Sequence, residues 1–393
     1  MQKKVRNSRN FYLSPMRKGF HITERMKFLF GIVGSLFFFF VLTLQFSTTS
    51  VSREALDVSR VKDLADRSKF DLLKEDIEKI TRVRVPDTPS HNDVKQYIIS
   101  EIENYQSWKL EKHSFTSPTP LGAKQFTNLI ATWSPASTKK NKKENERRVI
   151  LAAHYDSKLF DFNFVAATDS GVACGLLLDI IRTLDEEFTR YSIQPSPRIN
   201  SQLSLQIIFF DGEEAFRDWT ATDSLYGSRE LASKWEQADL AFKQASTEEG
   251  QEFDRKSEGI ENIEVFILLD LIGAKDPVPQ FRPYFPDTQD VHKQFTRLEN
   301  LLVKGEMYDI SNVPSDKSRN PYFSSSLATN FRVEDDHIPF LRRKVPIVHL
   351  IPYHKFPTVW HKTTDNLSAV DWIQVSNLSI LFRCWVAQYF NFV

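Results

Sequence analysis

Four short, almost uninterrupted apolar runs set the strongest limit on how this chain of 393 residues can fold. They are VILAA, LSLQIIFF, IEVFILL and VPIVHLI, at residues 149–153, 203–210, 263–269 and 345–351. Strands buried on both faces have this pattern, and they belong to largely parallel sheets. Helical spacing of apolar residues follows at 172–184, 228–235, 291–303 and about 370–390. The alternation predicts a single α/β domain with a central, mostly parallel sheet flanked by helices.

Two helical segments and two β-like runs precede the first buried strand. The helices are expected at 70–80 and 94–102, and the β-like runs at 108–115 and 126–133. The charged block 139–148 is interpreted as a solvated loop between strands. The polar stretches 244–261 and 309–330 are interpreted as surface loops within the same domain.

Composition excludes several classes of protein. The chain has 51 Lys and Arg residues against 51 Asp and Glu residues, whereas a nucleic-acid-binding protein carries a basic excess, so we expect no nucleic-acid partner. Because 41% of the residues are hydrophobic, an acidic, disordered chain is excluded as well. The two cysteines, Cys174 and Cys384, allow at most one disulfide. The fold must therefore depend on a large buried core.

The N-terminal end of the chain is interpreted as a membrane anchor. Residues 28–46 form an uncharged, Phe-rich run, which as a helix nearly spans the ~30 Å hydrocarbon core of a bilayer. Lys and Arg dominate the residues before it, so the positive-inside rule keeps that end in the cytoplasm. The expected organisation is a cytoplasmic tail (1–27), a transmembrane signal-anchor (28–46), a lumenal stem (47–68) and a catalytic domain (69–393).

A short span of this kind suits a thin early-secretory or Golgi bilayer. We therefore expect a single-pass type II protein of the Golgi membrane with a lumenal catalytic domain. The alternative is a secreted protein, released after the run is cleaved as a signal peptide. Glycosylation sequons at Asn366 and Asn377 agree with either location, although Asn377 falls in an apolar helical pattern.

Acidic and histidine side chains follow the four buried runs. His154 comes directly after the first run, Glu213 and Glu214 follow the second, Asp270 follows the third, and His361 lies beyond the fourth. In α/β sheets, ligands bind beyond the carboxyl ends of the strands. We therefore expect these side chains to lie close together.

Taken singly, some of these residues have simple structural explanations. Asp169, just ahead of a predicted helix, has the position of an N-cap, and His349 that of a hydrogen-bonded core histidine. Their coincidence at the strand ends favours a site instead. One His, one Asp and one Glu form a catalytic zinc set that leaves a fourth position open, and a neighbouring Glu stays free for proton transfer. HExxH, GxSxG, phosphate-loop and GxGxxG motifs are absent from the sequence.

Several linked motifs resemble those of the animal glutaminyl-peptide cyclotransferases, and together with the anchor they resemble the Golgi-resident form. They extend from about Phe70 to the C-terminus and are HYDSK, ATDSG, FFDGEEAF followed by a Trp and DSLYGSR, LLDLIGA, DDHIPFLRR followed by HLIP, and FP-x-VWH. The resemblance implies a fold shared with zinc aminopeptidases. It also implies conversion of N-terminal glutamine, and more slowly glutamate, of peptides and proteins to pyroglutamate, with release of ammonia or water.

The resemblance further implies a role for each matching residue. One zinc ion per chain would be bound by Asp169, Glu214 and His361. The catalytic residues would be Glu213 as proton shuttle, Asp270 holding the substrate, and Asp335 in an acidic hydrogen-bond network. Two further members of that network would be Ser170 and His349. The walls of the substrate pocket would be Trp219, Phe356 and Trp360.

One departure from the family concerns its cysteines. Ala153 stands where relatives often carry a cysteine, and Cys174 stands at the position of its partner. The bridge seen in such relatives cannot form here, and a pairing of Cys174 with Cys384 stays open.

Two other functions are weighed against the cyclase. A two-zinc aminopeptidase would use His154 and Asp270 for its second metal, and a receptor module would have lost the metal. Peptidases of this type run almost directly from the glutamate pair to a Gly-Ser turn, whereas residues 216–226 intervene here before Gly227. That insertion favours the cyclase, and we expect its catalytic domain to be a monomer.

Overall fold

The computed structural model describes residues 58–135, 146–193, 202–247, 259–313, 321–329, 333–352 and 354–392. The predicted cytoplasmic tail, the predicted transmembrane segment and the first part of the predicted stem lie outside these residues. Within the described residues, no helix is both long and apolar enough to cross a bilayer.

The described residues form one six-stranded sheet in the order β1-β2-β4-β3-β5-β6. The strands are β1 (Lys109–Thr119), β2 (Gly122–Trp133), β3 (Arg147–His154), β4 (Leu203–Phe210), β5 (Ile263–Leu269) and β6 (Ile347–Leu350). Strands β4, β3, β5 and β6 are parallel to one another, as the apolar runs predict. The sheet is nevertheless mixed, because the β1–β2 hairpin is added antiparallel to β4.

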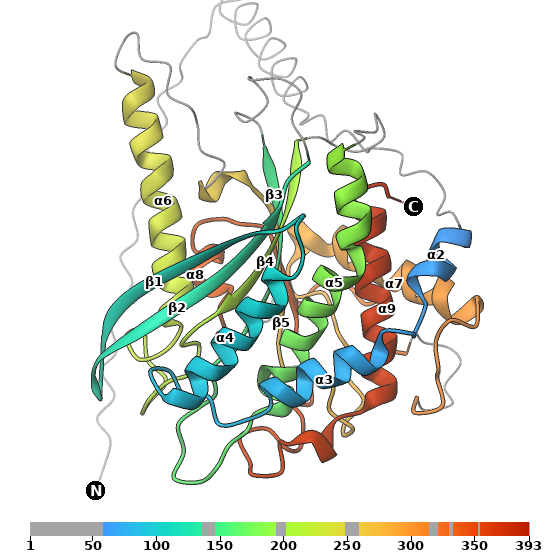
Figure 1. Cartoon of the computed structure of the whole chain (residues 1–393), viewed down its shortest axis with the longest axis horizontal. Coiled ribbons are helices and arrows are strands. Elements are labelled where there is room, and N and C mark those ends of the chain that lie inside the picture. The colour runs from blue at the N-terminus through green and yellow to red at the C-terminus, as the bar shows by residue number, and fades with distance from the viewer. Residues whose placement is uncertain are drawn as a thin grey trace, which may run out of the picture. The chain divides into compact units, whose positions relative to one another are not determined.

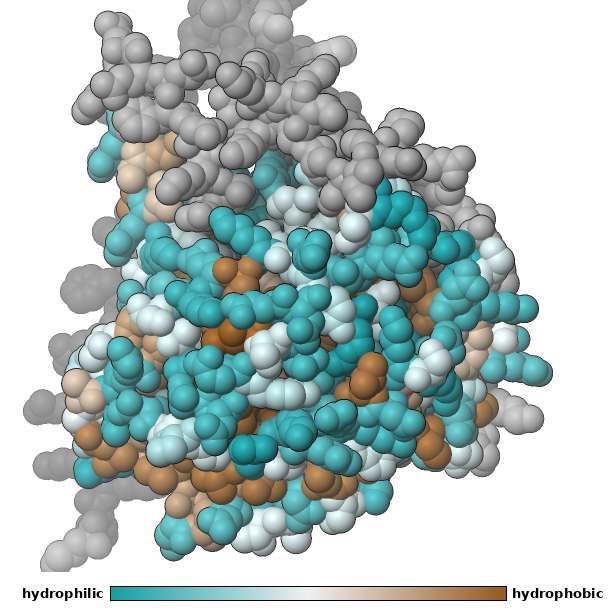
Figure 2. Space-filling model, in the orientation of Figure 1, coloured by the Kyte–Doolittle hydropathy of each residue, from teal (hydrophilic) through white to brown (hydrophobic). Residues whose placement is uncertain are grey.

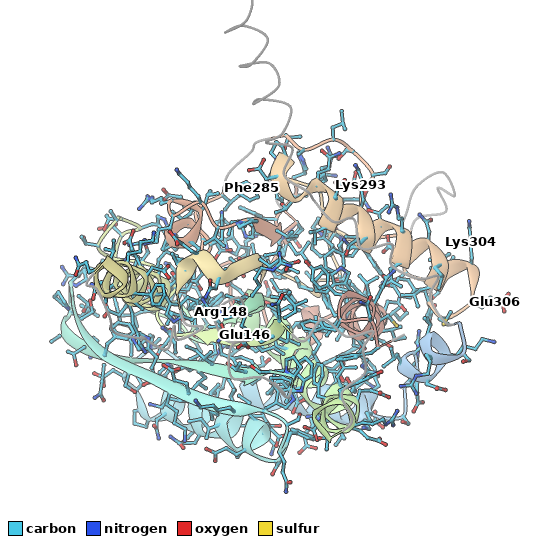
Figure 3. All side chains as sticks on the ribbon, turned by 90° about the horizontal axis from the view of Figure 1, so that it is seen from above. Glu146, Arg148, Phe285, Lys293, Lys304 and Glu306 are labelled. Atoms are coloured by element: carbon cyan, nitrogen blue, oxygen red, sulfur yellow. The ribbon has the colours of Figure 1, made fainter. Side chains whose placement is uncertain are left out.

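Helices cover both faces of this sheet (Figure 1). They are α2 (Val58–Leu64), α3 (Phe70–Ile80), α4 (Pro89–Glu103), α5 (Val172–Ile193), α6 (Tyr226–Thr247), α7 (Gln289–Lys304), α8 (Ile338–Leu341) and α9 (Trp372–Tyr389). Seen from above, α7, which carries Lys293 and Lys304, lies on the side of the fold away from the β1–β2 hairpin (Figure 3).

Strand β3 shows how the sheet separates two apolar cores. Val149 and Leu151 contribute to a core with residues of α3, α4, α5, α7 and α9. Ile150 and Ala152 face the other way and join a second core with residues of α6 and α8. Since side chains alternate along a strand, a run that is apolar at every position requires helices on both faces. The face that carries α3 and α4 is mainly hydrophilic on its outside (Figure 2).

Helix α2 changes the expected boundary of the domain. Residues 58–68 were expected to belong to a stem, but Val61 is fully buried in the main core. The buried Arg383 of α9 donates to the carbonyl oxygens of Leu64 (3.4 Å) and Asp66 (2.9 Å) and also pairs with Asp179 of α5 (2.7 and 2.6 Å). The folded domain therefore begins at least as early as α2.

The structure also answers two questions that the sequence leaves open. Cys174 and Cys384 are both buried and are not joined to each other. Asn377 is fully buried and donates to the carbonyl oxygen of Asp309 (2.6 Å) and to the Tyr322 hydroxyl (3.1 Å). A glycan on Asn377 is incompatible with this packing, whereas Asn366 is partly exposed.

The buried pair between Arg383 and Asp179 generates a stability prediction. Replacing Arg383 by Leu leaves the Asp179 carboxylate buried without its guanidinium, so we expect the free energy of unfolding to fall by about 3–5 kcal/mol. Urea denaturation followed by tryptophan fluorescence measures this loss. The control is Lys293→Ala, which breaks an exposed pair with Asp290 and is expected to cost at most about 1 kcal/mol. Equal, small losses in both variants would contradict the prediction.

Candidate active site

The strand ends bring the predicted side chains to one edge of the sheet. β3 ends at His154, β4 leads into Glu213 and Glu214, and β5 leads into Asp270. These strands are parallel, so their carboxyl ends lie side by side. A cavity of about 500 Å³ opens there. Its lining includes eight of the predicted residues, which are Asp169, Glu213, Glu214, Trp219, Asp270, Phe356, Trp360 and His361.

Asp169, Glu214 and His361 form one candidate metal centre. Their ligand atoms all lie within 4.8 Å of one another, and His361 Nε2 is 3.4 Å from Asp169 Oδ2 and 3.3 Å from Glu214 Oε1. Asp169 Oδ2 is buried and has no hydrogen-bond donor among the described residues. One nitrogen and two carboxylate oxygens are a ligand set for catalytic zinc, so these residues fit that ion.

The charges of this group also favour a cation. Burial alone would lower the pKa of His361, but the carboxylates of Asp169 and Glu214 raise it to about 9. The same negative field that holds a proton on the imidazole attracts a metal ion, which binds neutral imidazole. Metal binding at this centre is therefore expected to release a proton.

Asp169 is held in place by its loop rather than acting as an N-cap. It lies in the short π-helical turn Ala167–Gly171 that precedes α5, and its carboxylate faces the imidazoles of His154 (3.1 Å) and His361 (3.4 Å). The buried guanidinium of Arg84 donates to the carbonyl oxygens of Val165 (2.6 Å), Ala166 (2.9 Å) and Asp169 (3.3 Å). Arg84 thus fixes the turn that presents Asp169.

The glutamate pair is fixed by a buried carboxylate. Asp156 accepts hydrogen bonds from the backbone amides of Glu213 (3.0 Å) and Glu214 (3.2 Å). Burial raises the pKa of Asp156, but His154 and these two amides lower it below its usual value. Sequence reasoning gave no role to Asp156 or to Arg84. Asp156 stands in the HYDSK motif, so its position there was the one available signal.

Glu213 lies beside the candidate metal centre without belonging to it. It is buried, and burial raises its pKa well above the usual value, with further contributions from Glu214, Asp335 and Asp336, while His154 acts in the opposite direction. A bound cation would also act in the opposite direction. The position suits a group that exchanges a proton during a reaction.

The residues expected to form an acidic network occur as two hydrogen-bonded pairs. The Ser170 hydroxyl donates to Asp270 Oδ1, and His349 Nε2 lies 2.7 Å from Asp335 Oδ2. Burial lowers the pKa of His349 to about 4 and raises the pKa of Asp335 well above its usual value, so the two side chains form a hydrogen-bonded pair in which either one can hold the shared proton. His349 is therefore both a hydrogen-bonded core residue and a partner of a predicted site residue.

Aromatic side chains form the outer wall of the cavity. Phe356 and Trp360 lie with ring centroids 4.8 Å apart, and Trp360 stacks on His361 at 4.3 Å. Trp219 and Trp360 are each 38% exposed, so both reach the mouth of the cavity. Lys158, which sequence reasoning did not select, also lines the cavity and donates to Glu214 Oε2 at 3.1 Å.

Two further groups have ligand atoms within 4.8 Å of one another. They are His154, Asp169 and Asp270, and Asp335, His337 and His349. The first corresponds to the second metal position of the aminopeptidase alternative. In both groups an imidazole nitrogen faces a carboxylate directly, at 3.1 Å from His154 to Asp169 and 2.7 Å from His349 to Asp335.

Comparison with known proteins agrees with this fold and identifies the family. Residues 128–385 match the family model described as Peptidase family M28, and the chain belongs to this family. A Zn-dependent exopeptidase from Parabacteroides distasonis has the same fold, with a TM-score of 0.54 at 20% identity, over 80% of this chain and 95% of the other.

More similar proteins define the group within the family. The glutaminyl-peptide cyclotransferase of Gloydius blomhoffii is 40% identical over 322 residues, which are 80% of each chain. The crystal structure of Macrostomum lignano glutaminyl cyclase has a TM-score of 0.68 at 30% identity, covering 86% of this chain and 95% of the other. Within the M28 family, the chain thus belongs with the glutaminyl-peptide cyclotransferases.

Proposed function

We infer that this chain is an aminoacyltransferase that uses one zinc ion to cyclise N-terminal glutamine, and more slowly glutamate, of peptides and proteins to pyroglutamate. The convergence of Asp169, Glu214 and His361 beside the unligated carboxylate of Glu213, inside an aromatic-walled cavity, carries this proposal. The similarity to named glutaminyl-peptide cyclotransferases supports the same reaction.

In this mechanism, Asp169, Glu214 and His361 would hold a zinc ion, which would supply a Lewis acid for the γ-carboxamide oxygen of the substrate. Trp219, Phe356 and Trp360 enclose the first side chain and exclude water. Glu213 accepts a proton from the α-amine as its nitrogen bonds to the carboxamide carbon, and returns it as the carbon–nitrogen bond to ammonia breaks. Because the amine and the carboxamide belong to one residue, little entropy is lost on their approach.

Asp270 lines the same cavity as Glu213 and is proposed to hold the α-amine. Its Oδ1 accepts hydrogen bonds from Ser170 and from the backbone amide of Leu271 (2.8 Å), which leave Oδ2 for the substrate.

The cellular location and the oligomeric state of the protein are proposed from its sequence. The uncharged run at 28–46 and the basic residues before it support a type II anchor in the Golgi membrane with the catalytic domain in the lumen. We propose that this domain acts as a monomer. Protease protection of the domain in intact membranes tests the orientation, and sedimentation of the purified domain tests the assembly.

The reaction is tested with a Gln-initiated peptide and the purified chain. We expect the peptide to lose about 17 Da by mass spectrometry, and a chelator to abolish the loss. A matched peptide with N-terminal Asn, whose side chain is one methylene shorter, is the control and should not react. Release of free N-terminal amino acids with two zinc ions per chain would support the aminopeptidase instead.

Two substitutions separate proton transfer from metal binding. Glu213→Gln keeps the size of the side chain but removes its base, so we expect zinc content to be kept and turnover to fall by about 10²-fold or more. His361→Ala removes a ligand, so both zinc and turnover should be lost. Elemental analysis and the peptide assay measure the two effects. Normal cyclisation by Glu213→Gln would show that another group carries the proton.

A further inference from the structure

Residues 216–226, the segment between the glutamate pair and Gly227, build one wall of the cavity. Arg217, Asp218 and Trp219 all line the cavity from this segment. The segment returns to the sheet edge through hydrogen bonds from Leu225 to the carbonyl oxygen of Glu213 (2.8 Å) and from Tyr226 to that of Gly212 (2.7 Å). The backbone conformation of the segment ahead of these hydrogen bonds determines the position of the Trp219 side chain.

One carboxylate organises that shape. Asp223 Oδ1 accepts from the backbone amide of Phe216 (2.9 Å) and from the hydroxyl of Tyr226 (2.8 Å). Its Oδ2 accepts from the backbone amides of Arg217 (2.9 Å) and Asp218 (3.1 Å). Asp223 is only 4% exposed, so little solvent reaches its carboxylate. All four of these donors belong to the segment 216–226 itself.

The arrangement requires the charged form of the side chain. Three consecutive backbone amides and a phenol all donate to Asp223, which a carboxylate satisfies with its two oxygens. Burial raises the pKa of Asp223, but the Tyr226 hydroxyl and the three amides lower it below the usual value. Asp223 is therefore ionised at neutral pH, and its bonds are of the stronger, charge-assisted kind.

Asp223 makes no contact with the candidate metal centre, and its carboxylate does not line the cavity. Its effect on the site passes through the backbone of residues 216–218 to Trp219. At the far end, the Trp219 indole donates to Glu334 Oε2 at 2.9 Å, and both of these side chains reach the mouth of the cavity. This exposed contact alone is too weak to hold the wall against solvent.

We propose that Asp223 is a positioning residue that holds the Trp219 wall and thereby sets the affinity of the site for the first residue of the substrate. The inference rests on the proposed cyclase function and adds a determinant of substrate affinity outside the cavity. Since Arg84 holds the turn of Asp169, and Asp156 holds the backbone of Glu213 and Glu214, loss of the Asp223 bonds acts on substrate binding and leaves the chemical step in place.

Steady-state kinetics of Asp223→Asn with a Gln-initiated peptide test the proposal. The amide side chain keeps the volume but offers one acceptor oxygen, so at least one pair of donors loses its partner. We expect KM to rise about tenfold, with kcat and zinc content close to those of the wild type. Asp239→Asn is the matched control: this buried aspartate accepts the backbone amide of Glu261 (3.0 Å) away from the cavity, and its KM should not change.

A double variant tests whether Asp223 acts through Trp219. If it does, Asp223→Asn combined with Trp219→Ala has the same KM as Trp219→Ala alone. The proposal would be overturned if the increases in KM caused by the two single substitutions multiplied in the double variant. It would also be overturned if Asp223→Asn alone left KM unchanged. Should Asp223→Asn fail to fold, Tyr226→Phe removes a single donor and is expected to raise KM about twofold to threefold; an unchanged KM there would overturn it equally.

The wild-type measurement separates the two levels of inference. A wild-type chain that does not cyclise the peptide would remove the proposed function and this inference with it. A wild-type chain that cyclises, with the KM of Asp223→Asn unchanged, would remove the role of Asp223 alone.

Discussion

Burial of several carboxylates within a few ångströms of one another is the constraint on which the rest of this structure depends. Asp156, Asp169, Glu213, Glu214 and Asp335 are all buried at one edge of the sheet. An unpaired buried charge costs several kcal/mol, so such a group persists where cations, donors or protons compensate it. The arrangement is stable only if each carboxylate has a specific partner.

The fold supplies a different partner for each carboxylate. Backbone amides satisfy Asp156, His349 forms a hydrogen bond with Asp335, and the pKa of Glu213 is raised so that it holds a proton readily. Asp169 and Glu214 both face His361, Asp169 also faces His154, and Glu214 also pairs with Lys158. The chemistry proposed for the site follows from the two carboxylates that share His361, because together with that imidazole they form the ligand set that a divalent cation would bind.

Another buried carboxylate, that of Asp223, shapes the wall of the cavity and not the candidate metal centre. The fold is shared with a Zn-dependent exopeptidase, so the fold alone does not decide between cyclisation and hydrolysis. The segment 216–226 adds an aromatic wall, and Asp223 gives that wall a fixed shape without contacting the metal centre. In the proposed enzyme, neighbouring parts of one loop would carry substrate selection and catalysis.

Much of this architecture was predictable because burial on both faces leaves a clear pattern. Strands β4 and β5 have the bounds that their apolar runs predict, and parallel strands necessarily bring their carboxyl ends together. The antiparallel hairpin was less clear, because β1 alternates between exposed and half-buried positions. The packing of α2 was missed, since its polar sequence resembles a stem and its attachment depends on Arg383, far away in the chain.

The sequence by itself determined which acidic and histidine side chains follow each buried strand. Because the ends of parallel strands lie together, it also determined which of these groups meet. Only the tertiary structure decided how those groups are held. Arg84, Asp156 and Asp223 act through backbone amides and carbonyls of distant or looped segments, and such bonds depend on three-dimensional proximity that has no periodicity in sequence. Buried apolar residues recur at regular spacing along the chain and can be recognised from it, whereas a single polar contact between distant residues leaves no such pattern.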